Sequence, residues 1–233
     1  MGLSGIGAIF DWDGVVVDSS AQHEQAWEGL ATEVGLALPA DHFERGFGLK
    51  NERIIPDILA WTRDEGEIRR LSLRKEALYR VALRERGIAL LPGVASFLAV
   101  LRRSGIPCAV GSSSHRENIE VALELLELDA FEAVVTAEDV SAGKPDPEVF
   151  LLAAGRIGVP PGRCVVFEDV PAGIEAAHRG GMKAVAVTTT HPAAALTRAD
   201  LVVDRLDGLS PDSLQVLIDS EPATLPGSRG DRS

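Results

Sequence analysis

The stretch Ala8-Ile9-Phe10-Asp11-Trp12-Asp13-Gly14-Val15 decides the fold. Its apolar residues stop at a turn, which is typical of a short buried strand in a parallel sheet. In open α/β sheets, ligands bind in the crevice beyond the carboxyl ends of the strands. Two carboxylates as close as Asp11 and Asp13 repel each other, so they persist most easily beside a hard cation. An ordinary strand that ends in an Asp-Gly turn explains this motif equally well.

Three further polar clusters follow along the chain. Residues 106–111 form an apolar run that leads into Ser112-Ser113-Ser114, and residues 164–167 form another that leads into Glu168-Asp169. Between these two clusters, a lysine stands among prolines in Gly143-Lys144-Pro145-Asp146-Pro147. The chain therefore carries an acid pair, a hydroxyl cluster, a lysine and a second acid pair, in that order.

This ordered set resembles the four motifs of the haloacid dehalogenase (HAD) superfamily of phosphotransferases, over about residues 6–218. The resemblance implies an α/β fold, a Rossmann-like parallel sheet with a helical cap domain inserted after the first strand. Three segments resemble the cap of the β-phosphoglucomutase-like group of sugar-phosphate phosphatases and mutases. They are Asp18-Ser19-Ser20-Ala21-Gln22-His23 with Ala26-Trp27 after it, Gly48-Leu49-Lys50, and Arg74-Lys75-Glu76.

Hydrophobic periodicity predicts the same organisation. Residues 17–89 read as helices, one ending at Gly35, one over 51–61 that is bent or restarted near Pro56, and one over 64–86. Elsewhere strands and helices alternate, which specifies a parallel sheet with right-handed crossovers. The expected strands are 6–11, 106–111, 133–136, 164–168, 183–188 and 201–203, and the expected helices are 93–104, 115–127, 147–157 and 171–179.

These patterns predict three regions. Residues 1–16 and 90–218 form the core, and residues 17–89 form a cap that lies as a lid over the crevice. The tail, residues 219–233, has too little apolar surface to pack, so we expect it to be disordered.

Composition limits the partners. The chain has 233 residues and a net charge of −12, so nucleic acid and anionic membranes are unlikely partners, because phosphate backbones are held by Lys and Arg. Cys108 and Cys164 lie in expected core strands and read as buried free thiols. No secretory signal and no membrane-spanning stretch is visible. We therefore expect a cytoplasmic protein, a monomer, that acts on a small phosphorylated metabolite.

The resemblance assigns a metal and a nucleophile to the two acid pairs. An aspartate carboxylate can attack phosphorus to form an aspartyl-phosphate, and Asp11 is the expected nucleophile. Because nucleophile and phosphate are both anionic, a divalent cation must bridge them, and Mg²⁺ prefers oxygen ligands. Asp11 and Asp169 would supply side-chain oxygens and Asp13 its backbone carbonyl. Glu168 would ligate directly or through water.

The remaining core residues receive roles in proton transfer and phosphate binding. The free carboxyl of Asp13 would give a proton to the leaving oxygen and take one from water, a task that usually needs a raised pKa. Ser112 would hold phosphate oxygens with neighbouring N–H groups at a helix N-terminus, and Ser113 is a candidate substrate contact. The plain alternative is a helix N-cap, which all three serines would provide equally well; both can hold, with Ser113 or Ser114 as the cap and Ser112 binding phosphate. Lys144 offers positive charge to the transferred phosphoryl group.

Four candidate substrate contacts lie in the expected cap: His23, Asn51, Arg53 and Lys75. A packed core histidine and a solvated lysine are the plain alternatives for His23 and Lys75. A mutase of the related group would hold a second phosphate with an arginine at the position of Asn51, and Arg53 comes two residues later. We therefore expect a Mg²⁺-dependent phosphatase acting on a small organic phosphate, a sugar phosphate foremost. The alternative is a β-phosphoglucomutase-type phosphosugar mutase. A non-catalytic binding module would have lost Asp11, Lys144 or Asp169, and all three are present.

Overall fold

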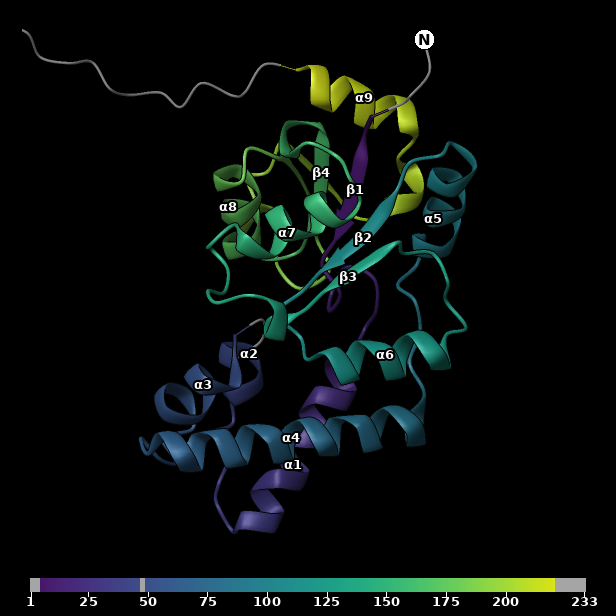
Figure 1. Ribbon diagram of the computed structural model, residues 1–233. Helices are drawn as coiled ribbons and strands as arrows, with labels where there is room; N and C mark the ends of the chain where they lie inside the picture. Colours follow the sequence, from purple (N-terminus) through teal and green to yellow (C-terminus); the bar gives the residue numbers. More distant parts are fainter. Residues whose placement is uncertain (1–4, 47–48, 221–233) are drawn as a thin grey trace, which may run out of the picture.

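A parallel six-stranded sheet organises the protein (Figure 1), whose computed structural model describes residues 5–46 and 49–220. The strand order is β3-β2-β1-β4-β5-β6, so β1 lies at the centre between β2 and β4. This confirms the predicted Rossmann-like α/β fold. The strands are β1 (Gly7–Phe10), β2 (Cys108–Gly111), β3 (Ala133–Val135), β4 (Cys164–Glu168), β5 (Lys183–Val187) and β6 (Leu201–Val203). Residues 221–233, most of the expected tail, lie outside the described residues.

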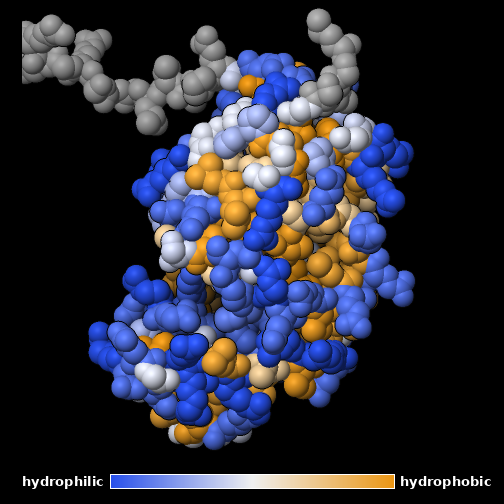
Figure 2. Space-filling view, viewed as in Figure 1, coloured by the Kyte–Doolittle hydropathy of each residue, from blue (hydrophilic) through white to orange (hydrophobic). Residues whose placement is uncertain are grey.

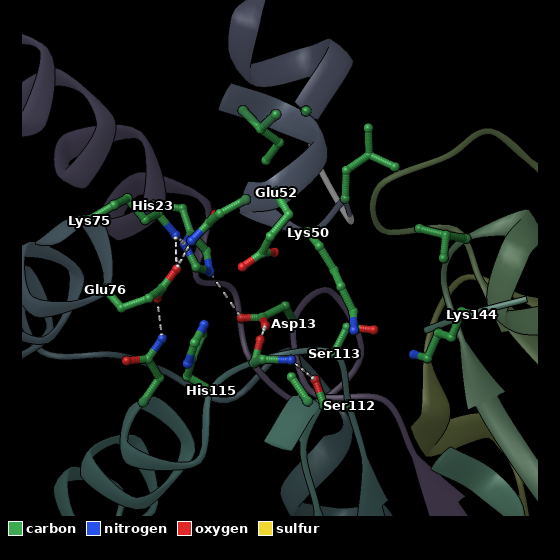
Figure 3. Close-up of a pocket in the computed structure, with 18 of the residues that line it drawn as sticks. Asp13, His23, Lys50, Glu52, Lys75, Glu76, Ser112, Ser113, His115 and Lys144 are labelled. Atoms are coloured by element: carbon green, nitrogen blue, oxygen red, sulfur yellow. Dashed lines mark hydrogen bonds and ion pairs between the residues drawn. The ribbon is translucent and has the colours of Figure 1, made fainter. Parts of the chain in front are cut away.

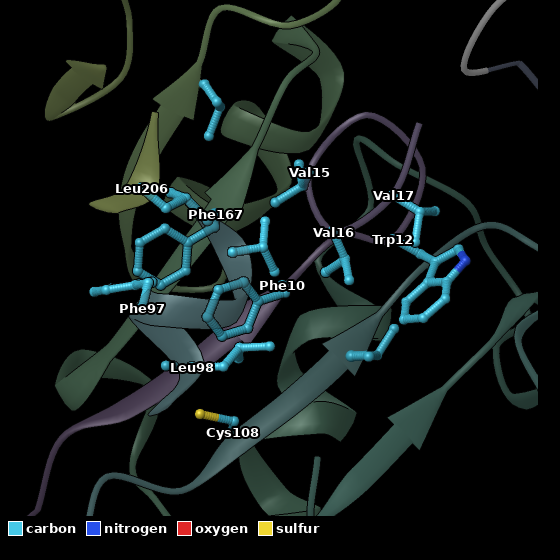
Figure 4. Packing of buried hydrophobic residues seen from close by; sticks show 14 of the residues in the cluster. Phe10, Trp12, Val15, Val16, Val17, Phe97, Leu98, Cys108, Phe167 and Leu206 are labelled. Atoms are coloured by element: carbon cyan, nitrogen blue, oxygen red, sulfur yellow. The ribbon is translucent and has the colours of Figure 1, made fainter. Parts of the chain in front are cut away.

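Helices cover both faces of the sheet because successive residues of a buried strand point to opposite sides. On one face, the stacked rings of Phe10 and Phe167 have centroids 4.6 Å apart, and Phe97 packs edge-on against both (Figure 4). On the other face, Ile9 and Val166 belong to a second buried cluster. The covering helices are α5 (Val94–Arg103), α6 (Arg116–Leu125) and α9 (Pro211–Asp219) for the first face, and α7 (Glu148–Arg156) and α8 (Pro171–Arg179) for the second. Packing on both faces of the sheet fixes the position of the carboxyl end of β1.

A separate group of helices follows β1. It contains α1 (Ser20–Val34), α2 (His42–Gly46), α3 (Asn51–Arg53) and α4 (Glu65–Arg86), which lie together below the sheet in Figure 1. These helices share a buried apolar cluster of their own that includes Trp27, Leu30, Ile55 and Leu71. Much of their visible surface is hydrophilic (Figure 2). In the described part of the chain, no strand lies between β1 and β2, although isolated bridges occur beside Val17.

The helix expected over 51–61 differs from the prediction. Only Asn51–Arg53 is α-helical, and Ile54–Ile58 forms a π-helical turn. Pro56 has no N–H to donate to a carbonyl one turn earlier, so the α-helical ladder breaks there. The wider turn is closed by the N–H of Leu59, which donates to the carbonyl of Ile54 at 2.9 Å.

The two cysteines are free and buried, as predicted. Burial raises the pKa of both thiols to about 12. No helix in residues 5–46 or 49–220 has both the length and the apolar character needed to cross a membrane.

Candidate active site

Strand register brings the predicted clusters to one edge of the sheet. Phe10 pairs with Val110 of β2 and with Phe167 of β4, so the next residue, Asp11, lies between the ends of these two strands. The N–H of Asp11 donates to the carbonyl of Phe167 at 2.9 Å, which fixes its backbone. Ser112 directly follows β2, and Glu168 is the last residue of β4.

Lys144 joins Asp11 to the second acid pair. Its ammonium Nζ lies 3.0 Å from Asp11 Oδ2 and 2.5 Å from Glu168 Oε1. The other oxygen of Glu168 accepts hydrogen bonds from the N–H groups of Asp169 and Val170, at 2.8 and 3.0 Å. The Glu168 carboxylate is thus fully buried and held on both sides. Asp11 and Glu168 outweigh the effect of burial and raise the pKa of the Lys144 ammonium, so Lys144 stays charged.

Three carboxylates converge beside this lysine. Asp11, Glu168 and Asp169 each offer an oxygen, and these oxygens lie within 4.8 Å of one another. Burial, with the nearby charges of Glu168 and Asp13, raises the pKa of Asp11 to about 7 against the lowering effect of Lys144. Burial and the nearby charges of Glu168 and Asp11 raise the pKa of Asp169. Asp11 Oδ1 is buried and has no hydrogen-bond partner in the described chain. An all-oxygen donor set with an unpartnered buried oxygen fits a hard divalent cation such as Mg²⁺.

The side chain of Asp13 points away from this cluster. One of its oxygens accepts a hydrogen bond from Ser19 Oγ and the other from Ser114 Oγ, and His23 Nε2 lies 3.6 Å from Oδ1. Burial raises the pKa of Asp13, but His23 and the two hydroxyls outweigh it and hold that pKa at about 2. The raised pKa that we expected for Asp13 is therefore wrong for the substrate-free protein. Donors surround the carboxylate, and each of them favours its ionised form.

The serine cluster also differs in part from the prediction. The Ser112 N–H donates to the carbonyl of Val135, and Ser112 Oγ accepts from the Ser114 N–H. The N-cap of α6 is His115, and the carboxylate of Glu138 accepts from the N–H of Arg116 in its first turn. The helix N-terminus is thus occupied by a protein carboxylate. The Ser112 hydroxyl hydrogen can still point to a phosphate, and Ser113 lies beside it on the cavity wall.

The helices after β1 contribute a buried polar chain to the same cavity (Figure 3). His23 stacks on Tyr79, and its Nδ1 accepts from Lys75 Nζ at 2.7 Å. Lys75 is 3% exposed, which excludes the alternative of a solvated lysine. Its ammonium also lies 3.0 Å from Glu76 Oε1, which accepts from the Asn51 amide at 2.6 Å.

A cavity of about 380 Å³ is lined both by residues at the ends of the strands and by residues of the helices that follow β1. Asp11, Asp13, His23, Asn51, Lys75, Ser112, Ser113, Lys144 and Asp169 all line it. Arg53 is not brought to this cavity. Its side chain is 74% exposed, and its guanidinium pairs with Asp57, four residues later, with Nε 2.7 Å from Oδ2. The break in the helix after Arg53 leaves this side chain on the outer surface.

Sequence reasoning missed several contacts of the site. Thr190 donates a hydrogen bond of 2.5 Å to Asp169 Oδ2, and it closes a run of three threonines after β5. That run carries the same signal as the serines after β2 and was available in the sequence. Gly14, with φ of 77°, lets Asp169 approach, because a Cβ at that position would lie 2.1 Å from Asp169 Oδ2.

Among the glycines that the structure describes, Gly173 has the least room for a side chain. A Cβ built on Gly173, in the first turn of α8, would lie 1.8 Å from Glu168 Oε1. We predict that Gly173→Ala lowers the free energy of unfolding by about 3 kcal/mol, because the buried Glu168 carboxylate has nowhere to move. Gly155→Ala in α7 is the matched control, since a Cβ there meets nothing within 4 Å. It should stabilise the protein by about 0.5–1 kcal/mol. Urea unfolding of both variants checks this, and equal effects would contradict it.

Comparison with known proteins identifies the family. The model of the haloacid dehalogenase-like hydrolases matches residues 7–181. The chain is 42% identical over 224 residues to 5-amino-6-(5-phospho-D-ribitylamino)uracil phosphatase, chloroplastic, of Arabidopsis thaliana. That match covers 95% of this chain and 60% of the relative, so the chain spans about three fifths of that protein.

Other relatives match over nearly their full length. The β-phosphoglucomutase of Bacillus subtilis is 34% identical over 208 residues, covering 87% of this chain and 90% of that protein. Hexitol phosphatase A of Escherichia coli is 33% identical over 204 residues, covering 88% and 93%. The crystal structure of β-phosphoglucomutase from Clostridium difficile superimposes with a TM-score of 0.79 at 29% identity, over 91% of this chain and 96% of that one. The chain therefore belongs to the haloacid dehalogenase-like hydrolase family.

Proposed function

We propose that the protein is a phosphatase that hydrolyses a small phosphorylated metabolite through an aspartyl-phosphate on Asp11. The observation that carries this proposal is the setting of Asp11. Its carboxylate lines the cavity, lies 3.0 Å from the Lys144 ammonium and close to Glu168 and Asp169, and has one oxygen unpartnered in the described chain. One oxygen of this carboxylate can attack phosphorus while the other faces a cation, and Lys144 offsets the negative charge of the transferred group.

A divalent cation, for which we propose Mg²⁺, would be held by side-chain oxygens of Asp11 and Asp169 and by the backbone carbonyl of Asp13. Both oxygens of Glu168 already accept hydrogen bonds from the protein, which favours contact through water over direct ligation for this residue. When bound, the ion offsets the repulsion between the Asp11 carboxylate and the phosphate.

Asp13 would move the proton. When Asp11 attacks, the bond from phosphorus to the leaving oxygen breaks and Asp13 protonates that oxygen. Water then attacks the aspartyl-phosphate, its proton goes to Asp13, and phosphate leaves. The first step needs a protonated Asp13, whose pKa is about 2 without substrate. A phosphate dianion arriving beside it raises that pKa, because like charges disfavour ionisation.

The helices of residues 17–89 would act as the cap. They have their own apolar cluster, and they supply His23, Asn51 and Lys75 to the cavity wall opposite Asp11. The names of the relatives indicate phosphate esters of polyhydroxy compounds, such as a ribityl chain or a hexitol. We therefore propose a sugar or polyol monophosphate as substrate, and a ribitylamino-pyrimidine phosphate is the first compound to test.

The second candidate is a phosphosugar mutase, which the match to β-phosphoglucomutases supports. A mutase must hold a second phosphate in the cap. In this chain Asn51 occupies the expected arginine position, and Arg53 lies on the outer surface. These two residues favour the phosphatase.

The metal assignment predicts that EDTA removes at least about 99% of the activity and that Mg²⁺ restores it. Ca²⁺ should restore little, because it takes more ligands at longer distances and disturbs the in-line geometry. Phosphate release measured at matched free metal concentrations checks this. Full activity after exhaustive metal removal would refute the metal site.

The choice between phosphatase and mutase is tested by two assays on one preparation. We predict release of inorganic phosphate from ribitylamino-pyrimidine, hexitol or pentose monophosphates. We predict little conversion of β-glucose 1-phosphate to glucose 6-phosphate, even with the 1,6-bisphosphate supplied. Isomerisation much faster than phosphate release would show that the enzyme is a mutase.

A further inference from the structure

The cap wall of the cavity offers hydrogen-bond acceptors and lacks free donors at Asn51 and Glu76. We propose that this pair selects monophosphates whose far end carries hydroxyl or N–H donors and rejects compounds that carry a second phosphate there. This inference rests on the phosphatase function proposed above, and it assigns a specificity role to Glu76.

The Glu76 carboxylate is buried and held in place from three directions. Oε1 accepts from the Asn51 amide and the Lys75 ammonium, and Oε2 accepts from the amide of Asn118 on α6. Two carboxylate oxygens can accept about four hydrogen bonds. Within residues 5–46 and 49–220, three of those positions are therefore filled, and one on Oε2 is left for a donor from the substrate. Asn118 belongs to the core, so the carboxylate is fixed relative to the catalytic end of the sheet.

The orientation of the Asn51 amide is decided by its partners. Its Nδ2 donates to Glu76 Oε1 at 2.6 Å and to Ser72 Oγ at 3.0 Å. A carboxylate only accepts, so the nitrogen must face Glu76, and both amide hydrogens are then used. What Asn51 has left for a ligand is its carbonyl oxygen, which is also an acceptor.

The charges on this wall of the cavity also disfavour a second phosphate. The Lys75 ammonium is compensated by Glu76 at 3.0 Å, so it offers no net charge to a second anion. Among the described residues that line the cavity, none is arginine. Lys50 also lines the cavity. Its ammonium lies beside the loop that contains Lys144, because a Cβ built on Gly143 would be 3.3 Å from Lys50 Nζ. That places the Lys50 charge beside the loop of Gly143 and not beside Glu76.

The first test needs no variant. Ribulose 5-phosphate and ribulose 1,5-bisphosphate differ only in a hydroxyl or a phosphate at carbon 1. For the Mg²⁺-loaded protein we expect kcat/KM for phosphate release to be at least about tenfold higher for the monophosphate, with most of the difference in KM. Equal values for the two compounds would overturn the inference.

The second test uses Glu76→Gln, which removes the charge and keeps the size of the side chain. The ratio of the two kcat/KM values should fall at least about fivefold, because a carboxamide no longer repels the second phosphate. Glu67→Gln, on the exposed side of the same helix and outside the cavity, is the matched control and should keep the wild-type ratio. Circular dichroism confirms folding of both variants.

The ratio of the two kcat/KM values distinguishes a role of Glu76 in substrate specificity from a purely structural role. If Glu76→Gln slows both compounds equally and the ratio stays at the wild-type value, Glu76 does not read the substrate. Acetyl phosphate, which is too small to reach Glu76, tests the chemistry itself in the wild-type protein. If it is not hydrolysed, the phosphatase function fails and this inference fails with it. If it is hydrolysed and the ratio is one, only this inference fails.

Discussion

Replacing Asp11 by asparagine should lower phosphate release by at least about 10⁴-fold and leave the fold intact. The amide cannot attack phosphorus, and its oxygen is a weaker ligand for a divalent ion than a carboxylate oxygen is. A discontinuous phosphate assay with a long incubation measures the residual rate. Asp129→Asn, the same substitution on an exposed side chain, is the control and should keep full activity. A residual rate near that of the wild type would mean that Asp11 is not the nucleophile.

The stability of Asp11→Asn adds an independent readout. Burial raises the pKa of Asp11 from 3.8 to about 7, so the folded protein disfavours its ionised form. A raised folded-state pKa gives stability that is present below pH 3.8 and is lost as pH rises through 7. The neutral variant avoids that loss. In metal-free buffer it should match the wild type near pH 4 and melt at a higher temperature at pH 8. A lower melting temperature at pH 8 would contradict the assigned environment of Asp11.

Much of the fold could be predicted because the signals are local. The apolar runs before Asp11, Ser112 and Glu168 are short and end in polar residues, and the sheet places all three ends side by side. The helix over 171–179 and the strand over 201–203 match their predicted bounds. The break after Arg53 was signalled by Pro56, but its form was not, because it depends on which carbonyl captures each freed N–H.

What failed involves contacts between residues far apart in sequence. Burial raises the pKa of Asp13, and His23 on α1 and Ser114, 101 residues away in the sequence, lower it below its ordinary value. No spacing in the sequence shows which serine turns toward which carboxylate. Arg53 is a candidate because of its charge and its place two residues after the expected arginine position, but its direction depends on a helix that ends at that residue. Glu76 stands beside Lys75 in the sequence, yet its role emerges only when Asn51 and Asn118 meet it in space.

Replacing Asp13 by asparagine should lower the rate by about 10²- to 10⁴-fold, the range expected for loss of a general acid and base. Metal affinity should change little, since the proposed metal contact of Asp13 is its backbone carbonyl. Asp169→Asn is the matched comparison. Its side chain lies in the carboxylate cluster, so we expect it to act mainly on metal affinity. Activity titrated with Mg²⁺ separates the two variants, and an equal loss of affinity in both would contradict the division of roles.

Stability should distinguish Asp13 from Asp11 in the opposite direction. Burial raises the pKa of Asp13, but His23, Ser114 and Ser19 bring it down to about 2, below its ordinary 3.8. A lowered pKa gives stability that is present above pH 3.8 and is lost as pH falls toward 2. Asp13→Asn should therefore cost up to about 2 kcal/mol of unfolding free energy at pH 7, and less as the pH approaches 2. Urea unfolding of both variants in metal-free buffer measures the contrast. If Asp13→Asn is as stable as Asp11→Asn at pH 7, the hydroxyls and His23 do not hold the Asp13 carboxylate in its ionised form. Another base would then have to accept the proton from water in place of Asp13.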